Sequence, residues 1–298
     1  MFLINFSFKR QFLSKKFMTK IRVGVVGCGA IGSEICKAID GDGDADLGME
    51  LKFLIDSHPE RTEKLRKSLI KKPAIIKSDS MRLDEILTEV DLLIECASQA
   101  AVREFAIPAL KKGKDVMILS VGALLCEDGL FEEIERISKE KRCKVYIPSG
   151  AVAGIDGLKS GAIGGIHSVL LTTRKPPSGF AGNAYVKEKG IDLLSIEEEE
   201  TLFTGSAKEA VRHFPENVNV AASLSLAGIG PEATRVKIVA DPSAVENVHE
   251  IDARGEFGKL FVRVENVPSR ANPKTSYLAA LSAIATLKSI SYPIRVGT

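Results

Sequence analysis

The chain reads IRVGVVGCGAIG at residues 21–32, and this segment predicts a nucleotide-binding fold for the first half of the protein. An apolar, β-branched run leads into the spacing Gly-x-Gly-x-x-Gly and then into an amphipathic stretch, a pattern typical of a strand, a tight turn and a helix. Gly27 permits the turn, Gly29 leaves space for a pyrophosphate, and Gly32 lets the helix approach the strand. The helix that begins at Ala30 would direct its first backbone N–H groups at the phosphates.

Asp56 supports this interpretation because it follows a second apolar run, residues 51–55, at the distance from Gly32 that dinucleotide-binding folds use. A carboxylate at this place can accept hydrogen bonds from the adenosine ribose and repels a 2′-phosphate. We therefore expect NAD or NADP as the cofactor, with NAD favoured, although Arg61 is near enough in the sequence to weaken that preference. The alternative is a glycine turn beside a solvated aspartate.

Short apolar runs and amphipathic stretches alternate from residue 21 to about residue 150. This alternation predicts an α/β fold, a Rossmann doubly wound parallel sheet. Ligands bind at the carboxyl ends of strands in such sheets, so we expect the small loops at residues 96–99 and 120–123 to lie beside the nicotinamide. The expected strands cover residues 22–26, 51–55, 74–76, 91–96, 115–119 and 144–147. The residues expected to contact the cofactor are Gly27, Gly29, Ala30, Ile31, Gly32, Asp56, Ala97 and Ser98.

The pattern changes after Gly150, and the rest of the chain predicts a second, α+β domain with a mainly antiparallel sheet. Gly255-Glu256-Phe257-Gly258 lies between two β-branched runs and is a hairpin signal. We expect one helix within residues 204–213, another over residues 217–227, and a last one capped by Asn272-Pro273. The expected strands cover residues 168–174, 236–240, 248–253 and 260–264. The apolar face expected for the last helix is Leu278, Leu281, Ile284 and Leu287.

These patterns divide the chain into four segments. Residues 1–20 contain basic but no acidic residues, and we expect either a disordered extension ahead of a start at Met18 or, as an alternative, a transit peptide. Residues 21–150 are expected to bind the dinucleotide, and residues 151–272 to form the substrate and catalytic domain. The helix in residues 273–298 is expected to pack back on the first domain.

Composition excludes several other classes of protein. The formal net charge of +2 argues against a nucleic-acid partner, and no apolar run is long enough to span a membrane. The five cysteines never form a Cys-x-x-Cys pair, which indicates reduced thiols and a cytoplasmic location rather than a zinc site. No metal is expected at the acidic stretch 40–46 either, because Ala45 and Leu51 stand where a calcium-binding EF-hand loop needs Gly and Glu.

Several motifs spread from about residue 21 to residue 290 carry a resemblance to a known family. They are GCGAIG (27–32), DLLIECAS (91–98), SVGAL (120–124), PSGA (148–151), TTRKPP (172–177), FTGSA (203–207) and FPENVNVAA (214–222). Together they resemble the L-aspartate dehydrogenase family, and the motifs after residue 148 are more specific than the glycine motif. The N-terminal extension and the acidic loop near Asp44 depart from the family pattern without touching these motifs.

The resemblance implies an NAD(P)-dependent oxidoreductase that converts the CH–NH2 group of L-aspartate to the imine, iminoaspartate. The imine would hydrolyse to oxaloacetate and ammonia or supply NAD biosynthesis. The same resemblance implies that Ala123 and Asn219 contact the cofactor and that His249 is the catalytic residue. Small dehydrogenases of this kind often dimerise through the sheet of the second domain, so we expect a homodimer.

The chemistry of this reaction requires a proton-transfer residue and a cation. Removal of a hydride from Cα needs a neutral amine, and a histidine that titrates near neutrality suits that step. For the two carboxylates of the substrate, the expected anchors are Arg174 and Lys175 at the end of a strand, followed by the backbone amides around Ser206. The residues alone do not choose among the four histidines. The candidates are His58, His167, His213 and His249.

Two other interpretations of the sequence stay open. A semialdehyde-type dehydrogenase would use Cys96 or Cys126 as a nucleophile activated by a histidine. A non-catalytic sensor would bind NAD and turn over no amino acid. The first alternative predicts loss of activity on thiol alkylation, and the second predicts cofactor binding alone.

Overall fold

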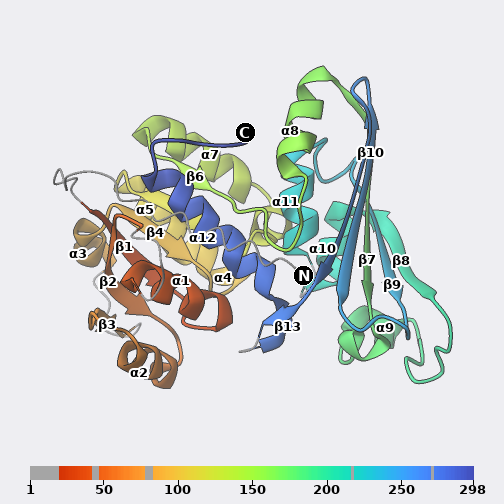
Figure 1. The fold of residues 1–298 in the computed structure, drawn as a ribbon, viewed down its shortest axis with the longest axis horizontal. Coiled ribbons are helices and arrows are strands. Elements are labelled where there is room, and N and C mark those ends of the chain that lie inside the picture. Colours follow the sequence, from red (N-terminus) through yellow and green to blue (C-terminus); the bar gives the residue numbers. More distant parts are fainter. Residues whose placement is uncertain (1–19, 42–46, 78–82, 216–217, 270–271) are drawn as a thin grey trace, which may run out of the picture.

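The first domain contains a six-stranded parallel sheet, which confirms the predicted Rossmann fold (Figure 1). The structure is a computed structural model that describes residues 20–41, 47–77, 83–215, 218–269 and 272–298. The strand order is β3-β2-β1-β4-β5-β6, and it reverses between β1 and β4, where doubly wound sheets bind their ligands. The strands are β1 Ile21–Val26, β2 Met49–Ile55, β3 Ala74–Ile76, β4 Leu92–Glu95, β5 Asp115–Ile118 and β6 Val145–Tyr146.

Helices cover both faces of this sheet and bury its nearly continuous apolar strands. In α7, for example, the buried residues are Leu130, Ile134 and Ile137, which recur at the helical spacing and so line one face. The helices are α1 Ala30–Asp40, α2 Pro59–Ser68, α3 Leu83–Ile86, the 3₁₀ turn Leu87–Glu89, α4 Gln99–Ala101, the π-helical segment Val102–Ala106, α5 Ile107–Lys111, α6 Ala123–Cys126 and α7 Leu130–Lys141.

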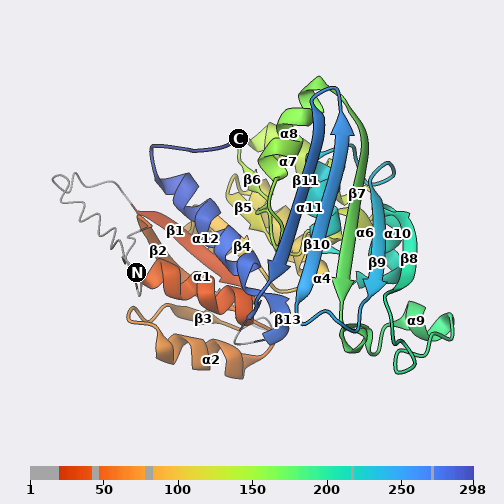
Figure 2. The same cartoon turned by 45° about the vertical axis from the view of Figure 1, so that its right-hand side comes forward.

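The second domain contains a five-stranded sheet in the order β11-β10-β7-β9-β8. All neighbours are antiparallel except β7 and β9, and β10 joins β11 through the predicted hairpin at Gly255–Gly258. Figure 1 shows α8 and α11 between this sheet and the first domain, and Figure 2 turns the opposite face of the sheet forward. The elements are α8 Ile155–Gly164, β7 Ile166–Lys175, the 3₁₀ turn Pro177–Phe180, α9 Ala184–Glu188, β8 Glu200–Ser206, α10 Ala207–His213, α11 Asn219–Ala227, β9 Arg235–Ala240, β10 Asn247–Gly255 and β11 Gly258–Asn266.

The helix expected within residues 204–213 is present as α10, but this segment begins as strand β8, because Phe203 and its neighbours pair with β9, and the helix starts only after Ser206. One expected boundary in this half is wrong. The residues expected to cap the last helix form strand β13 instead, which pairs with β12, and Ser276 is the N-cap. The remaining elements are β12 Pro268–Ser269, β13 Asn272–Ser276 and α12 Tyr277–Ser291.

The last helix, α12, packs against α1 of the first domain (Figure 1). Its buried residues are Ala280, Ala283 and Leu287, whereas Leu281, expected on the same face, is exposed. Leu287 and Ala283 join the apolar cluster that α1 forms with β1, and full burial of a leucine contributes about 2 kcal/mol. Residues 273–298 thus supply part of the core of the first domain.

Some expectations fall outside the described residues. The N-terminal extension at residues 1–19 is one, and most of the acidic stretch, residues 42–46, is another. Within the described ranges, no helix has both the length and the apolar character needed to cross a membrane.

Candidate functional site

The glycine motif forms the turn that a dinucleotide needs. Gly27 has a φ of +101°, and a Cβ there would lie 2.5 Å from the carbonyl oxygen of Cys96. A Cβ on Gly32 would lie 2.0 Å from the carbonyl oxygen of Gly27, so both positions require glycine. A Cβ on Gly29 would meet no protein atom within 4 Å, which leaves that side of the turn open to a ligand. Gly29 is also the N-cap of α1 and brings no side chain to the first N–H groups of the helix, so these can bind phosphate.

Asp56 holds this turn in place, a role that the sequence did not reveal. Its Oδ2 accepts a hydrogen bond from the Cys28 N–H at 2.7 Å, and its Oδ1 accepts one from the His58 N–H at 2.8 Å. Only 6% of the Asp56 side chain is exposed. The carboxylate therefore ties the glycine turn to the loop after β2, where the ribose of a dinucleotide would lie.

Glu95 is a second buried carboxylate, and the sequence analysis missed it. It ends β4, and its side chain is fully buried. Oε1 accepts hydrogen bonds from the Ala97 N–H at 2.8 Å, the Ser98 N–H at 3.1 Å and the Ser120 hydroxyl at 2.9 Å. Oε2 accepts one from the Ser120 N–H at 3.1 Å. Glu95 thus holds both loops that were expected beside the nicotinamide, and the signal for it was an acidic residue in an otherwise apolar strand.

A cavity of about 190 Å³ lies where the two domains meet. It is large enough for a small substrate beside the end of a cofactor, and polar groups from the second domain face apolar groups from the first. The lining residues of the first half are Ile31, Leu119, Val121, Pro148, Gly150 and Ala151. Those of the second half are Lys175, Asn219, Val220, Ser223, Asn247, His249, Thr275, Ser276 and Ala279.

His249 lines this cavity from β10 and is buried. It lies opposite Thr173 of β7, and its Nδ1 is 3.0 Å from the Thr173 hydroxyl oxygen. Burial, and to a lesser extent the charge of Lys175, lowers the pKa of His249 to about 3. The imidazole is therefore neutral at ordinary pH, and in the tautomer whose Nδ1–H donates to the Thr173 hydroxyl oxygen it can accept a proton through Nε2.

Lys175 and Arg174 are neighbours on β7, but they lie on opposite faces of the sheet. Lys175 lines the cavity with His249. The Arg174 guanidinium forms ion pairs with Glu199 and, at 3.3 Å, with Glu250 on the other face. Of the two cations expected to hold the substrate, only Lys175 reaches the cavity.

Asn219, the first residue of α11, joins the two domains. Its side-chain oxygen accepts a hydrogen bond from the Gly122 N–H at 2.9 Å, and Asn219 itself lines the cavity. The side-chain NH₂ group is then free to point elsewhere, including toward a cofactor amide. Ala123, the next residue after Gly122, is buried at the start of α6.

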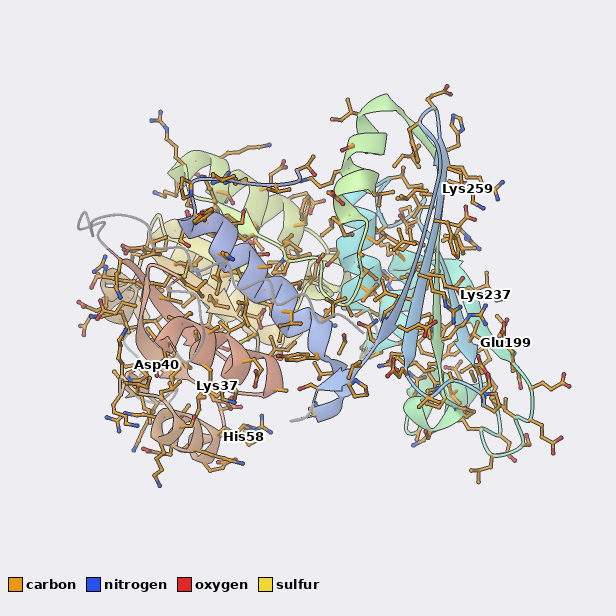
Figure 3. All side chains as sticks on the ribbon, in the orientation of Figure 1. Lys37, Asp40, His58, Glu199, Lys237 and Lys259 are labelled. Atoms are coloured by element: carbon orange, nitrogen blue, oxygen red, sulfur yellow. The ribbon has the colours of Figure 1, made fainter. Side chains whose placement is uncertain are left out.

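Several expected site residues do not line the cavity. Ser206 caps α10, where its side chain accepts a hydrogen bond from the Glu209 N–H at 3.2 Å. His58 is exposed beside α2 (Figure 3), and His167 is exposed and lies 2.9 Å from a carboxylate oxygen of Glu256. The His213 ring packs against Tyr185 with ring centroids 4.5 Å apart.

The cysteines show no sign of activation. Burial raises the pKa of Cys96 well above its ordinary value and also raises the pKa of Cys126. A nucleophilic cysteine needs a lowered pKa, so neither thiol supports the semialdehyde-type alternative. In the described ranges, no three His, Cys, Asp or Glu residues are grouped in a way that could hold a metal ion.

Comparison with known proteins covers nearly the whole chain. The family described as aspartate dehydrogenase, C-terminal, matches residues 156–290, and the NAD-binding domain family of homoserine dehydrogenase matches residues 27–148. The L-aspartate dehydrogenase of Methanosarcina acetivorans is 54% identical over 278 residues, covering 93% of this chain and 100% of the relative. The L-aspartate dehydrogenase of Methanosarcina mazei is 53% identical over 279 residues, with the same two coverages.

Solved structures agree with this result. The crystal structure of aspartate dehydrogenase from Thermotoga maritima superposes with a TM-score of 0.69 at 26% identity, covering 93% of this chain and 99% of that one. A homoserine dehydrogenase from Thiobacillus denitrificans gives a TM-score of 0.59 at 13% identity, covering 91% of this chain and 73% of that one. The second likeness concerns the fold alone.

Proposed function

This chain belongs to the L-aspartate dehydrogenase family, and on that basis we propose that the cavity between its domains is where L-aspartate is oxidised to iminoaspartate. The observation that carries the proposal is the meeting of His249 and Lys175 from the second domain with the segments that follow β5 and β6 in the first. The imine product would hydrolyse to oxaloacetate and ammonia or supply NAD biosynthesis.

The cofactor would lie along the carboxyl ends of β1 and β4. The open face of Gly29 and the uncapped N-terminus of α1 fit its pyrophosphate, and Ala30, Ile31 and Gly32 open that helix. Asp56 at the ribose position favours NAD over NADP, because a carboxylate repels a 2′-phosphate. When bound, the nicotinamide accepts a hydride from Cα of the substrate. Ala97, Ser98, Ala123 and Asn219 are the proposed contacts around that ring.

His249 is the proposed general base. Its neutral imidazole takes a proton from the substrate ammonium group through Nε2, which leaves the amine lone pair free to expel the hydride from Cα. The Thr173 hydroxyl holds Nδ1 and so keeps Nε2 directed at the substrate. The same imidazolium can return its proton when water adds to the imine.

Lys175 is the proposed anchor for a substrate carboxylate. Burial is the main cause of the lowered pKa of His249 and the charge of Lys175 adds to it, and a bound carboxylate would offset that charge. The histidine therefore becomes a stronger base when aspartate is in place. The sequence also suggested Arg174 and Ser206. Arg174 faces away from the cavity and Ser206 caps α10, so the proposal rests on Lys175.

We also propose a homodimer formed by the outer face of the second sheet. Leu170 and Phe261 are exposed on that face among ion-paired residues, an arrangement suited to a partly polar interface. The five free cysteines support a cytoplasmic location, where thiols stay reduced.

An NADH-absorbance screen across the amino acids, with L-aspartate included, tests the proposal directly. We expect reduction of NAD with L-aspartate and little with other amino acids. Turnover that requires phosphate or coenzyme A would favour the semialdehyde-type alternative, and cofactor binding without any turnover would favour the sensor.

A further inference from the structure

Glu95 lies directly behind the two loops that form the nicotinamide end of the proposed site. Building on the proposed function, we propose that Glu95 is a positioning residue that makes this site favour the oxidised nicotinamide ring over the reduced one. The donors to its carboxylate come from Ala97 and Ser98 in one loop and from Ser120 in the other.

The contacts favour an ionised carboxylate. Four neutral donors converge on its two oxygens, and the ionised form is acceptor-only, whereas a protonated carboxyl would place its own O–H among them. Burial raises the pKa of Glu95, whereas the hydrogen bonds from Ala97, Ser120 and Ser98 act in the opposite direction. The site therefore holds a buried negative charge that hydrogen bonds from neutral donors stabilise.

The hydrogen bonds also fix the direction of the loop carbonyl groups. In a trans peptide the C=O points opposite to the N–H, so the carbonyls of Ala97 and Leu119 point away from Glu95. Leu119 and Val121, on either side of Ser120, line the cavity. The buried carboxylate, which lies behind this part of the lining, thus contributes negative potential at the end of the site where the ring would lie.

A nicotinamide ring carries a positive charge when oxidised and loses it on accepting a hydride. The negative potential stabilises the charged ring and has little effect on the neutral one, so it lowers the dissociation constant of NAD⁺ relative to that of NADH. Because the carboxylate is buried, salt screens this interaction weakly. A unit charge roughly 10 Å away at an effective dielectric constant of about 20 changes an affinity about tenfold.

The test is the ratio of the dissociation constants of NADH and NAD⁺, measured by NADH fluorescence and displacement by NAD⁺ on the intact protein. Glu95→Gln keeps the size of the side chain and removes its charge. We expect this ratio to fall about tenfold in E95Q, because NAD⁺ binding weakens more than NADH binding. A purely structural role would weaken both cofactors equally and leave the ratio unchanged.

Asp40→Asn is the matched control. Asp40 is also a buried carboxylate that accepts backbone N–H groups, from Ile70 and Lys71, but it lies at the far end of α1 from the glycine motif (Figure 3). We expect D40N to leave the ratio at the wild-type value. An unchanged ratio in folded E95Q, or an equal fall in D40N, overturns the proposal.

Wild-type protein provides a test that needs no variant. Binding of NADH more than about a hundredfold tighter than NAD⁺ would contradict an anion that favours the oxidised ring. Failure of wild type to bind either cofactor would instead overturn the proposed function. The two failures are therefore distinguishable.

Discussion

The Thr173 hydroxyl oxygen lies 3.0 Å from Nδ1 of His249, across two neighbouring antiparallel strands. Both residues are buried, so the contact is shielded from water. A histidine ring held at one nitrogen keeps its orientation, and when Nδ1–H donates to the hydroxyl oxygen, Nε2 is available for proton transfer. The contact with Thr173 can therefore be tested by a substitution that leaves His249 itself unchanged.

Thr173→Val removes the hydroxyl and keeps the shape of the side chain. We expect kcat for L-aspartate to fall about fivefold, the size of one hydrogen bond of roughly 1 kcal/mol, because the ring is no longer oriented. Thr173→Ser restores the hydroxyl and should recover most of the rate. Steady-state kinetics of the pair check this, and equal rates in the valine and serine variants would contradict it.

His249→Asn removes the proposed base. We expect kcat to fall by roughly 10²–10⁴, the usual contribution of a general base, while NADH binding and the melting temperature stay close to wild type. His58→Asn and His213→Asn serve as controls and should remain active. If the His249 variant kept most of its activity, the assignment of the base would be wrong.

Lys175→Met removes the proposed carboxylate anchor, and Arg174→Met changes its neighbour on the opposite face of the same strand. A charge-assisted hydrogen bond contributes about 1.5–3 kcal/mol, so K175M should raise the KM for L-aspartate by at least about tenfold. R174M should leave that KM near wild type, because Arg174 is paired with Glu199 and Glu250. The reverse result would place Arg174 in the site.

The lowered pKa of His249 makes stability depend on pH. The pKa falls from 6.5 in the unfolded chain to about 3 in the fold, so between these values the unfolded chain binds a proton that the native protein does not. Stability is therefore lost as pH falls below about 6.5. Compared with H249N, wild type should lose about 2 kcal/mol more of unfolding free energy between about pH 7 and about pH 5 in urea titrations. If the unfolding free energies of wild type and H249N changed equally with pH, His249 would not be the cause of the pH dependence.

Asp56→Ala tests the proposed preference for NAD. Loss of the carboxylate removes repulsion of a 2′-phosphate and should shift relative affinity toward NADP. It also releases the Cys28 N–H, so both cofactors should bind more weakly than in wild type. The ratio of the two dissociation constants is the informative quantity, and an unchanged ratio would remove Asp56 from the ribose site.

Much of the first domain could be predicted because its signals are local. The spacing of Gly27, Gly29 and Gly32 reflects steric limits that no other residue satisfies at the first and third positions. Boundaries in the second domain were harder, because β8 exists only through pairing with β9, and residues 200–206 carry no strong alternation of their own. Tertiary pairing decided those elements rather than local propensity.

The site shows the same division. Of the residues whose roles the family resemblance implied, His249 and Asn219 line the cavity. Both Arg174 and Lys175 were expected as anchors, but which of them faces the cavity depends on strand register, where a shift of one residue exchanges their faces. Glu95 was missed because its role depends on four hydrogen-bond donors. Two come from Ala97 and Ser98 in the loop that follows it, and two come from Ser120 in the loop after the neighbouring strand.

The return of α12 to α1 has a consequence for biosynthesis. The ribosome completes the strands of the first sheet early, but Ala283 and Leu287, which cover part of the cluster around Ile35, are made only after the second domain. Until they emerge, that apolar surface stays open and the first domain cannot reach its final stability. The whole second domain is therefore translated while the core of the first domain is incomplete. During this delay, chaperones that recognise exposed apolar surface have their best opportunity to bind.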